Sequence, residues 1–201
     1  MPRPFLAYIR AIDAMNRFIG RIAMYLVFVL MGVLLWSSVS KAAFLPATWT
    51  LETAQFVMVA YYVLGGPYSI QLGSNVRMDL FYGDWSPRTK AMVDGFTVFF
   101  LLFYLVVLFM GAVSSTAYAL GYFGMEPFAF FGDLFLTLIT EGPGAAQDKL
   151  GFLERSPTAW RPPLWPIKVV LCLGVFLMIL QALAEFLRDI RYLSEGETDV
   201  A

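Results

Sequence analysis

Long stretches without a charged residue are the feature that most restricts what this chain can fold into. Four occur, at residues 22–40, 53–76, 95–125 and 169–184, with 19, 24, 31 and 16 residues respectively. A helix needs about 20 mostly apolar residues to cross the hydrocarbon of a bilayer. The chain is 59% hydrophobic and 14% charged, whereas a typical soluble domain is about 25% charged. The sequence therefore predicts an all-α integral membrane protein.

Four transmembrane helices are expected, at residues 22–40, 51–72, 92–120 and 166–187, within a single membrane domain of residues 1–201. The fourth apolar run is short, but Lys168 can extend it because a lysine stem lies along apolar surface while its amine reaches water. A signal peptide is the alternative for the first run. That run is longer than the usual apolar core of about 7–15 residues in a signal peptide, so a retained anchor is favoured.

Basic residues predict the orientation of the four helices. With the N-terminus inside, nine arginines and lysines fall on inner segments and five on outer segments. The positive-inside rule then places both termini in the cytoplasm, and the outer loop at residues 121–165. The side chains expected at the lipid headgroups are Arg17, Arg21, Trp85, Arg88, Lys90 and Lys168.

Two segments are expected to lie beside the membrane rather than across it. Apolar residues from Phe5 to Ile19 recur at helical spacing, which predicts an amphipathic helix over 4–20 on the inner leaflet. Packing on a soluble face of a partner is the alternative. The apolar segment 128–140 is too short to span and contains Asp133, so it either lies on the membrane or packs on a partner.

No pattern of catalytic or cofactor-binding residues occurs. The chain has no histidine and no glycine-rich phosphate-binding motif. Its one cysteine, Cys172, lies in an apolar run, where a thiol usually fills space. We therefore expect no catalytic residue, cofactor or metal, and no nucleic-acid partner.

Charged residues near the predicted span ends have two interpretations. Glu52, at the start of the second span, could be an ion or proton site, or a first-turn acid that is wetted by the interface and faces the positive end of the helix dipole. The second interpretation is favoured by roughly three to one. Glu185 has Arg188 nearby as a partner, so an ion pair at the membrane surface is favoured there too.

Small and aromatic residues supply candidate contacts with another subunit. Gly111, Ser115 and Ala119 recur every four residues, a spacing that lets another helix approach closely. Trp160 and Trp165, in a stretch with four prolines over residues 156–166, form a second candidate contact on the outer side.

The second span and the turn after it resemble the small membrane subunit of tripartite ATP-independent periplasmic (TRAP) transporters. The matching features are an acid at the start of the span, small residues near its end, a hydrophobic–basic–hydrophobic–Asp turn and a proline before the third span. In this chain they are Glu52, Gly65 and Gly66, the turn with Arg77 and Asp79, and Pro87. Asn75 stands where many members have histidine.

The resemblance implies a subunit without chemistry of its own, in the inner membrane of a bacterium. Its partners would be a large permease subunit and a periplasmic solute-binding protein, besides membrane lipids. The small subunit would stabilise the scaffold of the large one during sodium-driven uptake of an organic acid. A cofactor-free membrane anchor of a redox enzyme is the alternative. A membrane enzyme acting on lipids is less favoured, because paired polar groups within a span are missing.

Cysteine labelling tests the predicted orientation. With a membrane-impermeant thiol reagent on intact cells, Ser156→Cys should react and Ser194→Cys should not, because the basic residues hold the termini inside. Reaction at position 194 without reaction at 156 would reverse the orientation.

Overall fold

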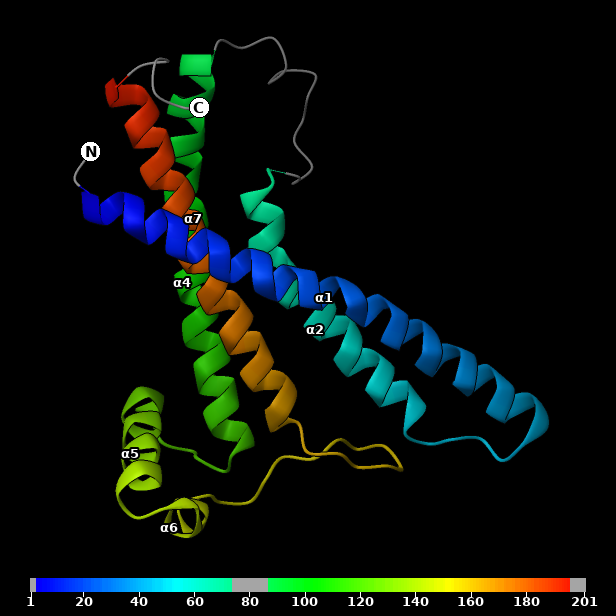
Figure 1. Ribbon diagram of the computed structural model, residues 1–201. Coiled ribbons are helices and arrows are strands. Elements are labelled where there is room, and N and C mark those ends of the chain that lie inside the picture. Colours follow the sequence, from blue (N-terminus) through cyan, green and yellow to red (C-terminus); the bar gives the residue numbers. More distant parts are fainter. Residues whose placement is uncertain (1–2, 74–86, 196–201) are drawn as a thin grey trace. The chain divides into compact units, whose positions relative to one another are not determined.

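The computed structural model describes residues 3–73 and 87–195, and these fold almost entirely into helices (Figure 1). The helices are α1 (Arg3–Ala43), α2 (Thr50–Gln71), α4 (Pro87–Ala119), α5 (Pro127–Thr140), α6 (Pro143–Asp148) and α7 (Trp165–Glu195). In this part of the chain, extended pairing is limited to one isolated antiparallel bridge, between Arg155 and Pro163. The all-α prediction is confirmed. Three residues of the predicted motif and headgroup set, Arg77, Asp79 and Trp85, lie outside the described residues.

Among the described helices, three are long and apolar enough to cross a membrane. Their apolar portions are Phe5–Ala43, Met92–Ala119 and Trp165–Arg191. The predicted second span corresponds to α2, whose 22 residues would extend about 33 Å. Its hydropathy is lowered by Glu52, Gln55 and the Gly65–Gly66–Pro67 segment, and it is not among the three. The four-span topology therefore stays a prediction. Three spans would place the termini on opposite sides, so a third labelling position near the N-terminus, Ala7→Cys, compared with Ser194→Cys, distinguishes these topologies.

Helix α1 joins two segments that the sequence analysis separates. An amphipathic helix over 4–20 and a span over 22–40 were expected, but one helix runs without interruption from Arg3 to Ala43. Its 41 residues contain no proline after the first turn to break it. The amphipathic helix was expected to end before Arg21, but the structure has no helix end there.

The chain forms two compact units. Unit one comprises the described residues within 1–25, 61–107 and 174–201, and unit two comprises 26–60 and 108–173. Each of the four long helices contributes residues to both units.

In unit one, the apolar stripe of α1 packs on α7. Ile9 and Ile12 are buried with Ala184, and Leu180 and Leu187 of α7 pack around them. The Tyr8 hydroxyl also donates a hydrogen bond to the carbonyl of Leu180, at 3.1 Å. We expected this stripe to meet lipid, and for Ile9 and Ile12 that expectation is wrong. At Ile9 and Ile12 the amphipathic pattern arises because these side chains are buried against another helix of the same chain.

Two glycines permit close helix contacts in unit one. A Cβ atom at Gly20 of α1 would lie 2.4 Å from Cβ of Tyr68 in α2. A Cβ atom at Gly174 of α7 would lie 2.2 Å from Cγ1 of Val63 in α2. Small residues at such positions let helix backbones approach where apolar burial gives little advantage over lipid. Helix α2 is thus covered by both α1 and α7, which explains why it tolerates lower hydropathy than the other long helices.

In unit two, glycines also bring the segment after α6 onto the end of α4. Gly121 has a φ of 85°, and the amide of Tyr122 reaches back to the carbonyl of Ala117, which is the geometry of a glycine-terminated helix. A Cβ at Gly121 would lie 2.5 Å from the backbone of Gly151, whose amide donates to the carbonyl of Leu120 at 3.0 Å. The segment after α6 is therefore anchored directly on α4.

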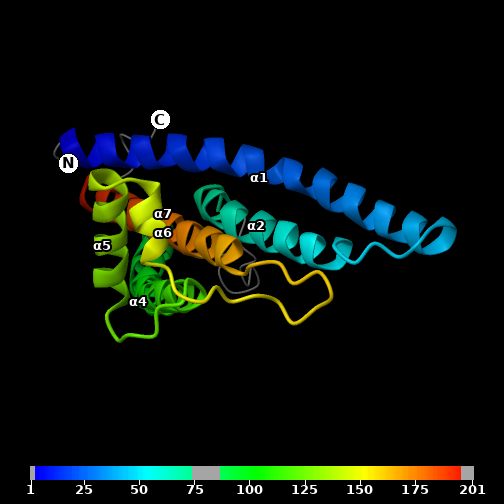
Figure 2. The ribbon, with the colours of Figure 1, turned by 90° about the horizontal axis from the view of Figure 1, so that it is seen from below.

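Helices α5 and α6 of unit two both begin at a proline, which fits the first turn of a helix because that turn needs no amide donor (Figures 1 and 2). Helix α5 ends at Glu141 and Gly142, whose amides both bond to the carbonyl of Thr137. The structure thus confirms that the apolar segment 128–140 is helical.

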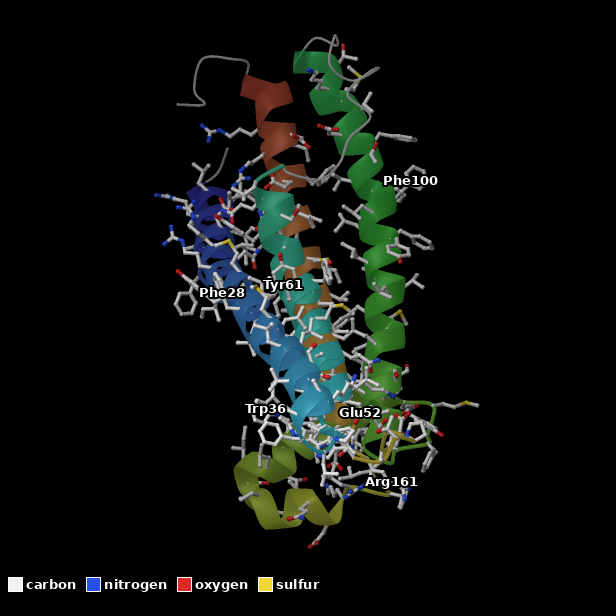
Figure 3. The ribbon with its side chains drawn as sticks, turned by 90° about the vertical axis from the view of Figure 1, so that its right-hand side faces the viewer. Phe28, Trp36, Glu52, Tyr61, Phe100 and Arg161 are labelled. Atoms are coloured by element: carbon white, nitrogen blue, oxygen red, sulfur yellow. The ribbon has the colours of Figure 1, made fainter. Side chains whose placement is uncertain are left out.

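Large apolar side chains cover much of the described surface. On α4, Phe96, Phe99 and Phe103 are each about two-thirds exposed, and Figure 3 shows Phe100 and Phe28 pointing away from their helices. Monomeric soluble proteins rarely expose such contiguous apolar area. These faces must meet lipid or another subunit.

The close contact at Gly20 yields a stability prediction. Gly20→Leu should destabilise the chain by about 1–3 kcal/mol, because the added atoms overlap Tyr68. Gly32→Leu on the same helix is the matched control, since a Cβ there has nothing within 4 Å. Thermal unfolding in detergent micelles, followed by circular dichroism, measures both. Equal midpoints for the two variants would contradict the observed packing.

Candidate functional site

The best-defined polar site of unit two surrounds Glu52 in the first turn of α2. Its side chain is 2% exposed, and Oε1 accepts hydrogen bonds from the hydroxyls of Ser156 and Thr158. Among the described residues, Oε2 has no hydrogen-bond partner. An acid in a first helical turn is favoured by the helix dipole. The expected position in the first turn is thus observed, but the expected wetting by the interface is wrong, because the segment with Ser156 and Thr158 covers this carboxylate.

The loop that covers Glu52 is a short hairpin-like segment. The Ser156 amide donates to the carbonyl of Pro162, and the Leu164 amide donates to Glu154, both at 3.0 Å. Arg161, at the turn, has a φ of 49°, a left-handed conformation that non-glycine residues adopt rarely. Figure 3 shows Glu52 and Arg161 at the same end of this unit. The stretch with four prolines therefore forms a folded hairpin.

Lys168 fixes the start of α7 to this hairpin and to α4. Its amine lies 2.5 Å from a carboxylate oxygen of Glu154 and donates to the carbonyl of Ser115 at 3.2 Å. It also lies 5.9 Å from the centre of the Tyr118 ring. Lys168 was expected at the headgroups; within the described residues it connects three segments of the chain.

The candidate interface residues occupy different environments. On α4, Gly111 is exposed, Ser115 is half-buried and Ala119 is 0% exposed. Ala119 is thus covered by this chain, and the three do not form one open face. Trp160 and Trp165 remain 44% and 38% exposed.

Other predicted residues are placed as follows. In α2, a Cβ added at Gly65 would have nothing within 4 Å, whereas a Cβ at Gly66 would meet Met178 at 3.1 Å. Both precede Pro67, which lies inside the continuous helix. The headgroup candidates Arg17 and Arg21 are exposed on α1 and Lys90 is half-buried on α4, while Pro87 and Arg88 form the first turn of α4.

A second polar cluster lies in unit one and was missed by the sequence analysis. Asn16 of α1 donates through Nδ2 to Oε1 of Gln181 in α7, at 2.6 Å, and both side chains are at most 1% exposed. The Gln181 amide nitrogen then donates to Asp13 at 3.1 Å and to Glu185 at 2.9 Å. A buried amide needs such partners, so this cluster fixes α1 against α7.

Arg188 completes the cluster. Its guanidinium donates to Glu185 on its own helix and to Asp13 on α1. The expected pairing of Glu185 with Arg188 is confirmed. One feature of the sequence could have revealed Asn16 and Gln181: each is a polar residue on an otherwise apolar helix face.

Both clusters consist of polar side chains that bond to one another. In each, acids pair with donors of the same chain. Over the described residues, no group of three or more Cys, Asp or Glu side chains is placed to hold a metal ion.

The arrangement defines a multi-pass α-helical membrane protein with exposed apolar faces and internally paired polar groups. Residues 30–130 match the family model of the tripartite ATP-independent periplasmic transporters, DctQ component. The chain belongs to this family, the small subunits of TRAP transporters, which are transport components rather than enzymes. The comparisons with curated proteins and with solved structures gave no match.

The burial of Ser156 affects the labelling experiment. Ser156 is 7% exposed and bonded to Glu52, whereas Ala159 in the same hairpin is exposed. Ala159→Cys is therefore the better outer position. The native thiol of Cys172 should be removed, since it is the one cysteine of the chain and is only half-buried, so it could also react with the reagent.

The contact with Glu52 can be measured with a double-mutant cycle. Ser156→Ala should destabilise the chain by about 1–3 kcal/mol, because it removes a donor from a buried carboxylate. In a Glu52→Ala background the same substitution should have a much smaller effect. Thermal unfolding of the four chains in detergent gives the coupling, with Ser114→Ala, an exposed position on α4, as control. Additive effects would show that the carboxylate and hydroxyl do not interact.

Proposed function

We propose that this chain is the non-catalytic small permease subunit of a sodium-coupled, binding-protein-dependent secondary transporter for organic acids. It acts in the inner membrane of a bacterium, with both termini in the cytoplasm. Its role is to stabilise the scaffold of the large permease subunit. The family match supports the subunit assignment, and the exposed aromatic faces of its helices support association with a larger partner.

The contact with the large subunit is proposed to include the middle of α4. Gly111 is exposed, and a Cβ added there would have nothing within 4 Å, so a partner helix can approach the backbone. Neighbouring side chains on the exposed surface of α4, such as Val107 and Met110, are about half exposed and apolar. Close packing supplies the specificity, because burial against protein gives little hydrophobic advantage over lipid.

The hairpin over residues 155–163 is proposed to help dock the solute-binding protein. Trp160 is 44% exposed at its turn, beside the strained backbone of Arg161. Aromatic and arginine side chains are enriched among residues that dominate binding energy. The bonds from Ser156 and Thr158 to Glu52 hold this hairpin in place.

In this proposal, Glu52 is a structural residue and does not couple ions. The two hydroxyl donors and the helix dipole account for a buried carboxylate at this position. The family match does not favour the redox-enzyme anchor that the sequence left as an alternative. The partner that copurifies tests this: a permease of roughly twelve spans is expected, and an oxidoreductase is not.

Copurification tests the proposed function. The tagged chain, expressed with candidate large permease subunits and solute-binding proteins from the same genome, should retain one such permease in mild detergent. Gly111→Leu should reduce the retained permease about tenfold or more, as expected when a close helix contact of about 1.4 kcal/mol or more is lost. Quantitative immunoblotting of the eluate provides the measurement.

Gly95→Leu is the matched control on the same helix. A Cβ added at residue 95 would also have nothing within 4 Å, and this residue lies about 160° around the helix from Gly111. Equal retention by both variants would move the contact to another helix. A stable isolated chain that never retains the permease would contradict the subunit role.

A further inference from the structure

Helix α5 carries its polar side chains along one line. Glu126, which precedes the helix as its N-cap, is followed at intervals of seven residues by Asp133 and Thr140. Seven residues make nearly two full turns, so the three positions lie on one side of the helix. All three are exposed, and Asp133 pairs with Lys149, whose amine lies 2.6 Å from the carboxylate. This line of residues is suited to face water.

The opposite side of α5 is apolar and exposed. Phe128, Phe135 and Ile139 are 52%, 65% and 68% exposed. At 3.6 residues per turn, these three positions fall within about 40° of one another around the helix. An apolar stripe can also arise from packing on another helix, as it does at Ile9 and Ile12. On α5, however, the described part of the chain leaves this side uncovered.

A ring contact gives the depth of this apolar side relative to α4. The ring of Phe128 lies 6.4 Å from that of Phe109, between centres, and Phe109 belongs to the apolar portion of α4. The charged amine of Lys168, which bonds to the carbonyl of Ser115, marks the polar boundary on the same helix. Phe109 lies six residues further into the span than Ser115, or about 9 Å along the axis. Helices at a membrane surface bury their apolar face about 5–10 Å into the boundary between headgroups and acyl chains.

A groove of about 870 Å³ connects α5 with the ends of two spans, all within unit two. Its walls are mostly apolar and include Leu134 and Leu138 of α5, Leu120 just after α4, and Trp165 and Val169 of α7. Figures 1 and 2 show α5 beside the last part of α4. The apolar surface of α5 is therefore continuous with surface that belongs to helices of span length.

We propose that α5 lies in the membrane surface, in the leaflet at the C-terminal end of α4, with Phe128, Phe135 and Ile139 among the acyl chains of phospholipids. Lipid is favoured over a protein partner because the polar line of α5 and the amine of Lys168 lie on the water side of one common boundary. Acyl chains also fill the groove that continues this surface. The inference concerns contact with lipid and does not depend on the proposed transport function.

Fluorescence quenching of the full chain in nanodiscs tests this contact. In a chain without Cys172, Ile139→Cys and Thr140→Cys each receive a bimane label. The two positions are adjacent and exposed, but they lie about 100° apart around the helix. Phospholipid brominated along its acyl chains should remove most of the fluorescence at residue 139 and little at residue 140, whereas aqueous iodide should do the reverse. Phe128→Cys and Glu126→Cys form the corresponding pair at the start of the helix.

Each outcome decides between lipid and its alternatives. Quenching of Ile139→Cys by iodide but not by brominated lipid would place this side of α5 in water and overturn the proposal. Lipid quenching that disappears when a permease copurifies would assign the side to that subunit instead. Equal lipid quenching at residues 139 and 140 would contradict the polar line at the boundary. Circular dichroism checks the fold of each variant, and the pair at 139 and 140 decides the matter should Phe128→Cys, which loses its ring contact, not fold.

Discussion

The structure depends on one constraint: a backbone surrounded by hydrocarbon must satisfy its amides and carbonyls internally. Long uninterrupted helices meet this requirement, and α1, α4 and α7 each exceed 30 residues. The same constraint explains where helices end. At the end of α4, Gly121 allows the chain to turn while its neighbours satisfy the last carbonyls. Departures from helix, such as the hairpin over residues 155–163, form their own backbone bonds.

Polar side chains are placed under a related rule. Burial of a carboxylate or amide is costly unless hydrogen-bond partners are present. Glu52 is accordingly covered by two hydroxyls, and Gln181 bonds to partners on two helices. These bonds connect segments more than 100 residues apart in the sequence. In a membrane, where apolar burial gives little preference for one helix pairing over another, such contacts and the close approaches at Gly20 and Gly174 select the arrangement within each unit.

The surface that the polar groups do not cover is apolar, and this surface relates the structure to the function. Polar and charged side chains near the core are engaged within the chain, while aromatic residues of α4 face outward. TRAP transporter small subunits are transport components, and under the proposed function the useful surface of this chain is the apolar exterior that a larger subunit can cover.

The sequence by itself determined the membrane class, the helical nature of each apolar run and the family, because these depend on local composition and on a short motif around Glu52. It also indicated the pairing of Glu185 with Arg188, since those residues are one helical turn apart. Only the tertiary structure decided that Ile9 and Ile12 meet α7 instead of lipid, that Ser156 and Thr158 cover Glu52, and that Asn16 meets Gln181. An apolar stripe has the same periodicity whether lipid or a helix covers it, and contacts between distant segments leave no local pattern in the sequence.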